Sequence, residues 1–436
     1  MSKETFVIHG GVPLRGTVRP GGNKNAAIKM LPACLLVDEP VVLHNIPRIR
    51  DVDVVIAMLR ELGAEVEWLS DASVRVDAAD AIAPDQPVPF AQEIRASFVF
   101  AGPLLGRFQR AVLPTPGGDV IGERRMDPHI NALRALGAEV QFADGVFSMQ
   151  TRGLKGAKIL LQEASVMATE NAILAAVLAE GTTVIDNAAG EPHVQDLCHM
   201  LNGLGGKIQG IGANRLLIEG VQRLHGGEAT VSADYMEVAS WVAAAAITRG
   251  EIRIQDAAPQ QMIMAQQVFA RLGIHWDVAG PDIVLPAAQE LRIQPDIGGR
   301  IPIIKAQPWP AFPTDLMSVA IVVATQCEGA VLFHDWMYES RLFFTDRLMR
   351  MGARITLCDP HRALVQGPTA LKAVGMITSP DIRAGMALVL GALAADGVTR
   401  IANIQQIDRG YEKVEEKLTA LGADIRRVTK HSEAVE

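Results

Sequence analysis

The stretch from Pro116 to His129 reads Pro-Gly-Gly-Asp-Val-Ile-Gly-Glu-Arg-Arg-Met-Asp-Pro-His and gathers several charged residues at a turn. Proline and two glycines are costly inside a helix or a central strand, so they favour an exposed loop with Asp119 at its tip. Arg124 and Arg125 follow, and their planar guanidinium groups suit the oxygens of phosphate or carboxylate. The stretch predicts either a small-anion site or an ordinary solvated turn with a surface ion pair.

Six further short motifs place cations, acids and amides along the rest of the chain. Arginine and lysine side chains of this kind can bind the oxygens of an anion. A single arginine is more often part of a surface ion pair, so each motif alone is a weak signal. The motifs are Gly22-Asn-Lys-Asn-Ala-Ala27, Arg95-Ala-Ser97, Ala311-Phe-Pro-Thr-Asp315, Glu339-Ser-Arg341, Asp381-Ile-Arg383 and Ile407-Asp-Arg-Gly-Tyr-Glu412.

The elements that must position these motifs form a repeat. The phrase Leu-Gly-Ala, or a close variant, recurs with its glycines roughly 70 residues apart, which is typical of a repeat architecture. Glycine at this position ends a helix in the left-handed conformation, and the apolar alternation that follows predicts a strand. The six glycines are Gly63, Gly137, Gly205, Gly273, Gly352 and Gly422.

Two segments, 238–247 and 386–394, are apolar on all sides of the predicted helix. Such a helix must be buried all round, which places the helices at the centre and the sheets outside. The sequence therefore predicts an α/β fold with two inside-out barrels, each built from three repeats of a βαβαββ-type unit. Residues 24–233 form the first domain, and residues 1–23 plus 234–436 form the second. The strand Thr5–Ile8 is expected to pair with the last units.

Composition excludes several classes of function. The 436 residues are 49% hydrophobic, which is enough for two or three compact cores, and no apolar run reaches the roughly 18 residues that cross a bilayer. A net charge of −8 argues against nucleic acid as a partner. The four cysteines form no C-x-x-C, so we expect buried free thiols and neither a zinc site nor disulfides. Without an apolar signal segment, the protein is expected to be cytoplasmic.

Taken together and in order, the seven motifs resemble those of the UDP-N-acetylglucosamine enolpyruvyl transferases (1-carboxyvinyltransferases), and the resemblance covers essentially the whole chain. It implies the two-domain inside-out fold, with the active site in the cleft between the domains. The implied reaction moves the enolpyruvyl group of phosphoenolpyruvate onto the 3-hydroxyl of UDP-N-acetylglucosamine and releases phosphate, in the first committed step of peptidoglycan synthesis. It needs no metal or organic cofactor. The expected partners are phosphoenolpyruvate and a UDP-sugar, and the chain is expected to be a monomer or a weak homo-oligomer.

The resemblance implies four catalytic residues. Asp315 takes the proton from the attacking 3-hydroxyl, for which it must lie within hydrogen-bond reach. The alternative is that Asp315 is only the N-cap of a helix that starts at Leu316. Lys24 and Arg409 match cations that hold phosphoenolpyruvate. Asp119 stands where most members carry a cysteine, which takes part in protonating C3 of phosphoenolpyruvate or in releasing product.

The resemblance also implies a larger set of substrate-binding residues. Asn25 looks like the amide that contacts the sugar. Glu339 is expected to orient Arg341, and Asp381 to orient Arg383, or each acid is an ion-pair partner with no further role. The full set is Asn25, Arg95, Arg124, Arg125, Asp127, Ser165, Val166, Glu339, Arg341 and Arg383.

The acid at position 119 has chemical consequences. A carboxyl has an ordinary pKa near 3.9 and a thiol near 8.5. To donate a proton at neutral pH, the pKa of Asp119 must rise by about 3, which corresponds to about 4 kcal/mol, while nearby arginines would lower it. We therefore predict activity that favours acid pH, and resistance to fosfomycin, which alkylates the cysteine of other members.

Other departures from the family pattern concern the acceptor. Arg125 replaces a usual proline, and Met167 replaces a glycine whose backbone approaches the diphosphate, so the methionine narrows the site or moves the ligand. The segments 301–310 and 336–338 are bulkier and more aromatic than the pattern, which a repacking of loops would also explain. Three alternatives stay open: a transferase for a different uridine nucleotide, a shikimate-pathway enolpyruvyl transferase, and a silent paralogue that binds a nucleotide or a protein.

Overall fold

The computed structural model describes residues 4–118, 122 and 124–429, which divide into two compact units. Of the described residues, unit 1 contains 4–21, 122 and 233–429, and unit 2 contains 22–118 and 124–232. Two of the passages between the units follow Gly21 and Ser232. Main-chain hydrogen bonds pair these crossings, from Asn23 N to Ser232 O at 2.8 Å and from Asp234 N to Gly21 O at 2.9 Å.

Three helices form the core of unit 1: α7 (Tyr235–Ile247), α9 (Thr314–Gln326) and α11 (Ile382–Ala394). They pack against one another, and every residue of α7 is buried. In α9 burial extends from Leu316 to Thr325, and in α11 from Ile382 to Leu393. A helix with no polar face is stable only in such surroundings. The prediction that the apolar segments 238–247 and 386–394 are buried helices is confirmed.

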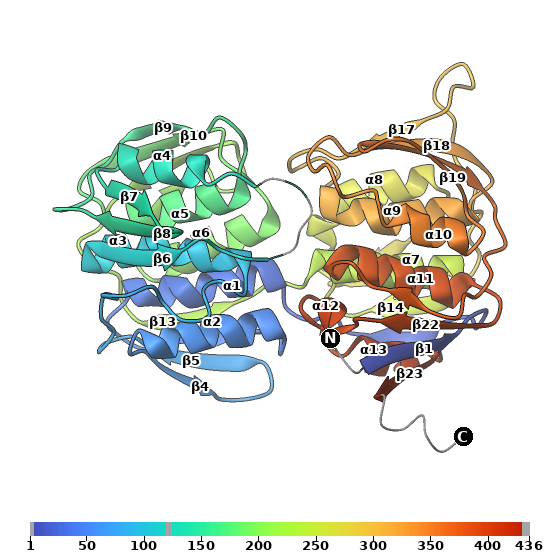
Figure 1. Ribbon diagram of the computed structural model, residues 1–436, viewed down its shortest axis with the longest axis horizontal. Helices are drawn as coiled ribbons and strands as arrows, with labels where there is room; N and C mark the ends of the chain where they lie inside the picture. Colours follow the sequence, from blue (N-terminus) through green and yellow to red (C-terminus); the bar gives the residue numbers. More distant parts are fainter. Residues whose placement is uncertain (1–3, 119–121, 123, 430–436) are drawn as a thin grey trace. The chain divides into compact units, whose positions relative to one another are not determined.

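The strands of unit 1 lie outside these helices, with β17, β18 and β19 on one side and β22, β1 and β23 on the other (Figure 1). Three four-stranded sheets have the orders β21-β22-β1-β23, β15-β16-β14-β2 and β17-β18-β20-β19. Alternate residues face the helices, as expected for a sheet with one buried face. The strands are β1 (Glu4–His9), β2 (Arg15–Val18), β14 (Glu251–Ile254), β15 (Asp277–Ala279), β16 (Asp282–Leu285), β17 (Ile303–Lys305), β18 (Gly329–His334), β19 (Arg354–Asp359), β20 (Arg362–Gly367), β21 (Ile377–Thr378), β22 (Val398–Ala402) and β23 (Asp424–Thr429).

The first strand, β1, is a central strand of a sheet whose other members come from the end of the chain. It pairs antiparallel with both neighbours, with Thr5 opposite Ala402 of β22 and Glu4 opposite Thr429 of β23. The prediction that Thr5–Ile8 pairs with the last units is therefore confirmed.

Unit 2 has the same kind of organisation around α1 (Lys24–Ala33), α3 (Ala101–Phe108) and α5 (Val166–Ala176). The 3₁₀ helix η2 (Arg95–Phe100) contacts all three of these helices. The sheets have the orders β13-β3-β5-β4, β11-β12-β10-β9 and β6-β8-β7. Their strands are β3 (Val41–His44), β4 (Glu65–Trp68), β5 (Ser73–Asp77), β6 (Arg110–Pro114), β7 (Glu139–Ala143), β8 (Val146–Gln150), β9 (Lys158–Leu160), β10 (Thr182–Asp186), β11 (Lys207–Gln209), β12 (Arg215–Glu219) and β13 (Gly227–Thr230).

The six predicted helix-ending glycines all have positive φ, from 83° at Gly273 to 100° at Gly205. Each lies immediately after the C-cap residue of a helix, so the prediction of left-handed C-terminal glycines is confirmed. The helices concerned are α2 (Arg50–Glu61), α4 (Asp127–Ala135), α6 (Pro192–Gly203), α8 (Ile263–Arg271), α10 (Thr345–Arg350) and α13 (Val414–Ala420); the short helices η1 (Cys34–Leu36), η3 (Pro259–Gln261) and α12 (Gln405–Asp408) complete the described set.

The cysteines differ in their exposure. Three cysteines are buried and free, but Cys358 on β19 is exposed, so the expectation of buried thiols is wrong at that position. An outward-facing strand position leaves its sulfur in solvent. Within the described ranges, no helix combines the length and the hydropathy that spanning a membrane requires.

Candidate active site

Asp315 lies in the first turn of α9, in unit 1. The helix begins at Thr314, and its N-cap residue, Pro313, supplies no side-chain hydrogen bond. The alternative that Asp315 is the N-cap of a helix starting at Leu316 is therefore wrong. A carboxylate in the first turn is favoured by the partial positive charge at the helix N-terminus.

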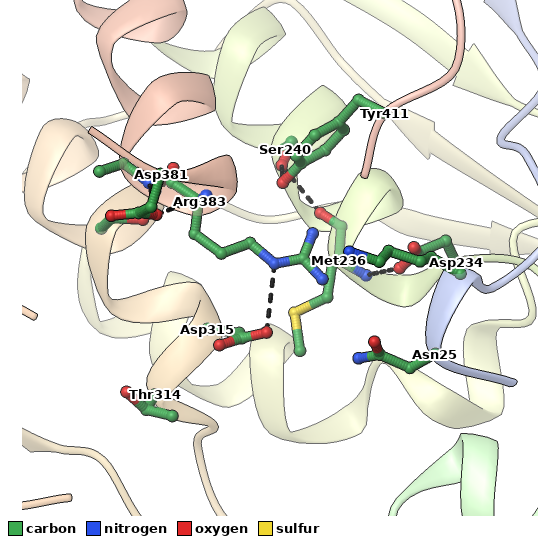
Figure 2. Close-up of polar contacts among 12 residues, drawn as sticks. Asn25, Asp234, Met236, Ser240, Thr314, Asp315, Asp381, Arg383 and Tyr411 are labelled. Carbon is green, nitrogen blue, oxygen red and sulfur yellow. Dashed lines mark hydrogen bonds and ion pairs between the residues drawn. The ribbon is translucent and has the colours of Figure 1, made fainter. Parts of the chain in front are cut away.

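The carboxylate of Asp315 bridges two arginines from separate parts of unit 1. Arg341 donates from Nη2 to Oδ1 at 2.7 Å, and Arg383 donates from Nε to Oδ2 at 3.2 Å, as the dashed line in Figure 2 shows for Arg383. Each arginine is only 5% exposed. One carboxylate thus contacts two buried cations.

Each of these arginines also keeps a spare donor. Nε of Arg341 and Nη1 of Arg383 are buried, and neither has a hydrogen-bond partner among the described residues. A buried donor left without an acceptor costs about 1–3 kcal/mol, and more when the group is charged. An anionic ligand with several oxygens would satisfy both donors.

The surroundings keep both guanidinium groups charged. Burial alone would lower the pKa of Arg341, but Asp315, Asp381 and Asp335 raise it, and the net pKa is above the ordinary value. For Arg383 burial acts in the same direction, while Tyr411, Asp315 and Asp234 raise the pKa, which again ends above its ordinary value. The two arginines are therefore permanent cations at any physiological pH.

Tyr411 and Asp381 hold Arg383 in place. The Tyr411 ring lies under the guanidinium, 5.4 Å from its centre, and the Tyr411 hydroxyl is 3.2 Å from Oγ of Ser240 on α7. Asp381 caps α11 by accepting hydrogen bonds from the main-chain N–H groups of Arg383 at 2.8 Å and of Ala384 at 2.9 Å. Asp381 thus contacts the main chain of Arg383, and its expected role in orienting the Arg383 guanidinium stays a prediction.

Arg409 and Glu339 have other contacts than the Asp315 carboxylate that Arg341 and Arg383 share. Arg409 follows α12, is half-buried, and donates from Nη1 to Oε1 of Gln406 at 3.0 Å. Glu339 is exposed, whereas the acids within ion-pair distance of Arg341 are Asp315 at 2.7 Å and Asp381 at 4.0 Å. Among the described contacts, Arg341 therefore pairs with Asp315 and Asp381, and not with Glu339 as predicted.

In unit 2, Lys24 begins α1 and forms a buried ion pair. Its Nζ lies 2.7 Å from Oδ2 of Asp51, with the two side chains 8% and 5% exposed. Asn23 caps the helix by accepting hydrogen bonds from the main-chain N–H groups of Asn25 at 2.9 Å and Ala26 at 3.2 Å. The cap fixes the direction in which the chain enters the helix, so Lys24 and Asn25 have defined positions.

Arg95 begins η2 and donates from Nη2 to the main-chain oxygen of Arg124, so the structure brings these two predicted residues together. Arg124 is half-buried, and Arg125 and Asp127 are exposed. Asp119, the predicted acid of the same loop, lies outside the described residues.

His129, at the end of this loop, is buried and neutral. Nδ2 of Asn171 donates to its Nδ1 at 2.9 Å, and the edge of the Phe98 ring packs against it at 5.3 Å between ring centres. Burial, with a smaller contribution from the charge of Arg95, lowers the pKa of His129 to about 3. We therefore assign His129 to the packing of unit 2 and not to proton transfer.

Ser165 caps α5, the third predicted element of unit 2. Its Oγ accepts a hydrogen bond from the main-chain N–H of Ala168 at 3.4 Å. Val166 and Met167 are half-buried and pack against the hydrophobic core of unit 2, so the Met167 side chain is accommodated by the core. A cavity of about 130 Å³ lies between α4 and the end of β9; its lining includes Pro128, Asn131, Leu160 and Gln162.

Comparison with known proteins identifies the relationship. The profile of the EPSP synthase (3-phosphoshikimate 1-carboxyvinyltransferase) family matches residues 8–418. The UDP-N-acetylglucosamine 1-carboxyvinyltransferase of Treponema pallidum is 50% identical over 420 residues, which cover 96% of this chain and 98% of that protein. The protein of the same name from Bradyrhizobium diazoefficiens is 49% identical over 430 residues, covering 98% and 99%. The chain belongs to the family of UDP-N-acetylglucosamine 1-carboxyvinyltransferases.

Solved structures share the fold of this transferase at lower identity. The enolpyruvyl transferase NikO from Streptomyces tendae has a TM-score of 0.86 at 24% identity, covering 98% of this chain and all of that one. An EPSP synthase from Acinetobacter baumannii has a TM-score of 0.75 at 18% identity, with the same coverage. The mixed α/β fold is therefore that of the enolpyruvyl transferases.

Sequence reasoning missed two buried acids of this transferase. Asp51 pairs with Lys24, and Asp335 lies beside the turn that carries Asp315. Each acid lies outside the quoted motifs. Asp51 stands in the first turn of α2, where acids are favoured.

Proposed function

We propose that this protein transfers the enolpyruvyl group of phosphoenolpyruvate to the 3-hydroxyl of UDP-N-acetylglucosamine and releases phosphate. Relatives that carry this activity in their names are 49% and 50% identical over nearly the whole chain. The observation that carries the proposal is the placement of Asp315 between Arg341 and Arg383, two buried cations that each keep a spare donor. This arrangement provides a base beside a site for an anion.

The proposed mechanism proceeds by addition and then elimination. The Asp315 carboxylate accepts the proton of the sugar 3-hydroxyl as its oxygen bonds to C2 of phosphoenolpyruvate, while C3 receives a proton. The intermediate still carries phosphate. Loss of a proton from C3 then re-forms the double bond as the C2–O bond to phosphate breaks. From the sequence alone, Asp119 is the proposed acid for C3.

The two arginines connect the base to the anion site. Both guanidinium groups donate to the Asp315 carboxylate, and each has a further donor that an oxygen of phosphoenolpyruvate would accept. The anion and the base are therefore held by the same two cations, which would place the attacking hydroxyl between them.

Unit 2 offers groups that suit a nucleotide. Arg125 and Asp127 are exposed, and Ser165 caps the first turn of α5. The cavity beside α4 has a volume of about 130 Å³, so only part of a flat ring fits into it. We place the uridine diphosphate portion here. Backbone N–H groups at the start of a helix suit phosphate oxygens.

Finer expectations from the sequence stay predictions within this proposal. They are the six repeats of one unit with three in each domain, a site in a cleft between the domains, a cytoplasmic location, and a monomeric or weakly associating state. The supply of product to peptidoglycan synthesis follows from the proposed reaction.

Phosphate release from phosphoenolpyruvate tests the proposal. The acceptors to compare are UDP-N-acetylglucosamine, UMP, UDP-glucose and shikimate 3-phosphate, each with the wild-type protein and with Asp315→Asn. We expect turnover with UDP-N-acetylglucosamine alone, and its loss in the variant. Turnover with another acceptor only, or full activity in the variant, would contradict the assignment of substrate or of base, respectively.

A further inference from the structure

Asp335 follows β18 directly and is completely buried, with 0% of its surface exposed. We propose that Asp335 is a positioning residue that fixes Asp315 and Arg341 relative to each other. It acts through Thr314 and through the loop that leads from β18 to Arg341. The inference rests on the proposed function, because it explains how the proposed base is held.

The carboxylate of Asp335 joins the two segments that carry these residues. Its Oδ2 accepts a hydrogen bond from Oγ1 of Thr314 at 2.5 Å, and Thr314 immediately precedes Asp315. Its Oδ1 accepts a hydrogen bond from the main-chain N–H of Met337 at 3.0 Å, in the loop that continues to Arg341. One side chain therefore fastens the start of α9 to the arginine-bearing loop.

The main chain of Asp335 is itself fixed by the turn between β19 and β20. Its N–H donates to the carbonyl of His361 at 2.8 Å, and its carbonyl accepts a hydrogen bond from Nδ1 of His361 at 2.7 Å. Since β19, β20 and β18 belong to one sheet, the carboxylate is anchored to a rigid element. Groups held in this way keep a neighbouring site within a few tenths of an ångström of its working geometry.

The start of α9 has particular need of this contact. Its N-cap is Pro313, which supplies no side-chain hydrogen bond to the first turn. The bond from Thr314 to Asp335 satisfies no main-chain N–H group, but it ties the first turn of α9 to β18 from outside the helix. If it is lost, the first turn is free to rotate or fray, and the distance of 2.7 Å between Arg341 Nη2 and Asp315 Oδ1 is no longer enforced.

An acid suits this position because two donors face it. Burying a carboxylate is unfavourable unless its oxygens accept hydrogen bonds, and both oxygens of Asp335 do so. An asparagine would present one acceptor and one donor, and its N–H₂ group would face either Thr314 or the N–H of Met337. A threonine hydroxyl also accepts hydrogen bonds, so the asparagine can donate to Thr314 while its oxygen accepts from Met337. Asp335→Ala, which removes both contacts, is therefore the variant that releases the two segments.

The test compares Thr314→Val, which keeps the shape and loses the hydroxyl, with Thr314→Ser, which keeps the hydroxyl. The matched control is Thr325→Val at the other end of α9, where the buried hydroxyl donates to the carbonyl of Val322 at 2.6 Å. Phosphate release with UDP-N-acetylglucosamine gives kcat. Calorimetric titration with phosphoenolpyruvate alone gives the affinity of the anion site, and thermal unfolding gives Tm.

For Thr314→Val we expect kcat to fall about 10- to 100-fold, because a misplacement of about 1 Å can cost a factor of that size. The affinity for phosphoenolpyruvate should fall several-fold. Thr314→Ser should restore both values to within about 3-fold, and Thr325→Val should leave both unchanged while lowering Tm by a similar amount. Asp335→Ala should behave like Thr314→Val.

Two results would overturn the proposal. One is a Thr314→Val protein with wild-type kcat and wild-type affinity, and the other is equal losses in Thr314→Val and Thr325→Val, which would reveal a general effect of stability. Absence of turnover in the wild-type protein would instead count against the proposed function. The affinities for phosphoenolpyruvate would then still decide whether Asp335 positions the anion site.

Discussion

A buried glutamate in unit 2 gives a prediction whose size follows from the structure. Glu170 on α5 is 0% exposed, and neither carboxylate oxygen has a hydrogen-bond partner among the described residues. Nζ of Lys29 on α1 lies 3.6 Å from Oε2. Burial raises the pKa of Glu170 from 4.5 to about 7, against the opposing effect of Lys29 and with a further rise from Glu191. We predict that Glu170→Gln makes the protein more stable than the wild type above neutral pH.

The sign follows from proton binding. The folded state holds the Glu170 proton up to about pH 7, while the unfolded state releases it near the ordinary value of 4.5. The stability contributed by this group is therefore present at low pH and is lost as pH rises through 7. At about 1.36 kcal/mol per pH unit, the gap between the two pKa values corresponds to about 3 kcal/mol. Glutamine resembles the protonated form at every pH and avoids this loss.

The assay is urea denaturation of both proteins between pH 5 and pH 8, followed by circular dichroism. Hydrogen exchange of the α5 peptides assigns the change to unit 2. All other titrating groups cancel in the difference between the two unfolding free energies. From pH 5 to pH 8, the unfolding free energy of Glu170→Gln should increase by about 2–3 kcal/mol relative to that of the wild type.

The control is Glu180→Gln, at an exposed position shortly after α5, for which the difference should stay flat with pH. The same flat result for Glu170→Gln would refute the reasoning. It would mean that the ion pair with Lys29 outweighs burial and keeps the carboxylate ionised throughout the range.

Three further predictions concern the site. Asp315→Asn should lower kcat by about 10²- to 10⁴-fold in the phosphate-release assay while phosphoenolpyruvate still binds, because the base is lost and the arginines remain; an unchanged kcat would remove Asp315 from the mechanism. Stoichiometric fosfomycin should neither inactivate nor add mass to the wild-type protein, whereas Asp119→Cys should become alkylated and should shift the kcat optimum from acid toward neutral pH; alkylation of the wild type would contradict this. Gly385→Ala should lower Tm by several degrees and reduce kcat, since its Cβ would lie 2.3 Å from Oγ of Ser379 and the helix must shift; a thermal scan that matches the wild type would show that the contact relaxes without cost.

Much of the fold could be predicted because its signals are local. A glycine that ends a helix needs only its own left-handed conformation, and Gly63 shows it with φ of 89°. An apolar helix such as α7 must be buried whatever surrounds it. Strand β1 was also predictable as a partner of the last units, because it follows the same pattern as the strands beside it.

The contacts of the site were less predictable, because they depend on tertiary packing. The motifs predicted that Asp315, Arg341 and Arg383 belong to the site. Their spacing in the sequence does not show that the Asp315 carboxylate bridges both arginines. Asp381 was expected to contact a guanidinium, and it caps α11 because a short acidic side chain before a helix reaches the main-chain N–H groups first. Asp335 lies outside the motifs, and its role follows only from the packing of β18 beside α9.

The central place of β1 has a consequence for how the protein is made. The ribosome releases β1 first, but β22 and β23, which flank it, emerge only at the end of synthesis. Unit 2 lies between them in the sequence, so it can fold while β1 still waits for its sheet. Once unit 2 has folded, the hydrogen bond from Asn23 N to Ser232 O holds the two ends of unit 2 together. The segment between the two parts of unit 1 then no longer behaves as a long flexible loop. The early folding of unit 2 thereby reduces the entropy lost when unit 1 brings its distant strands together.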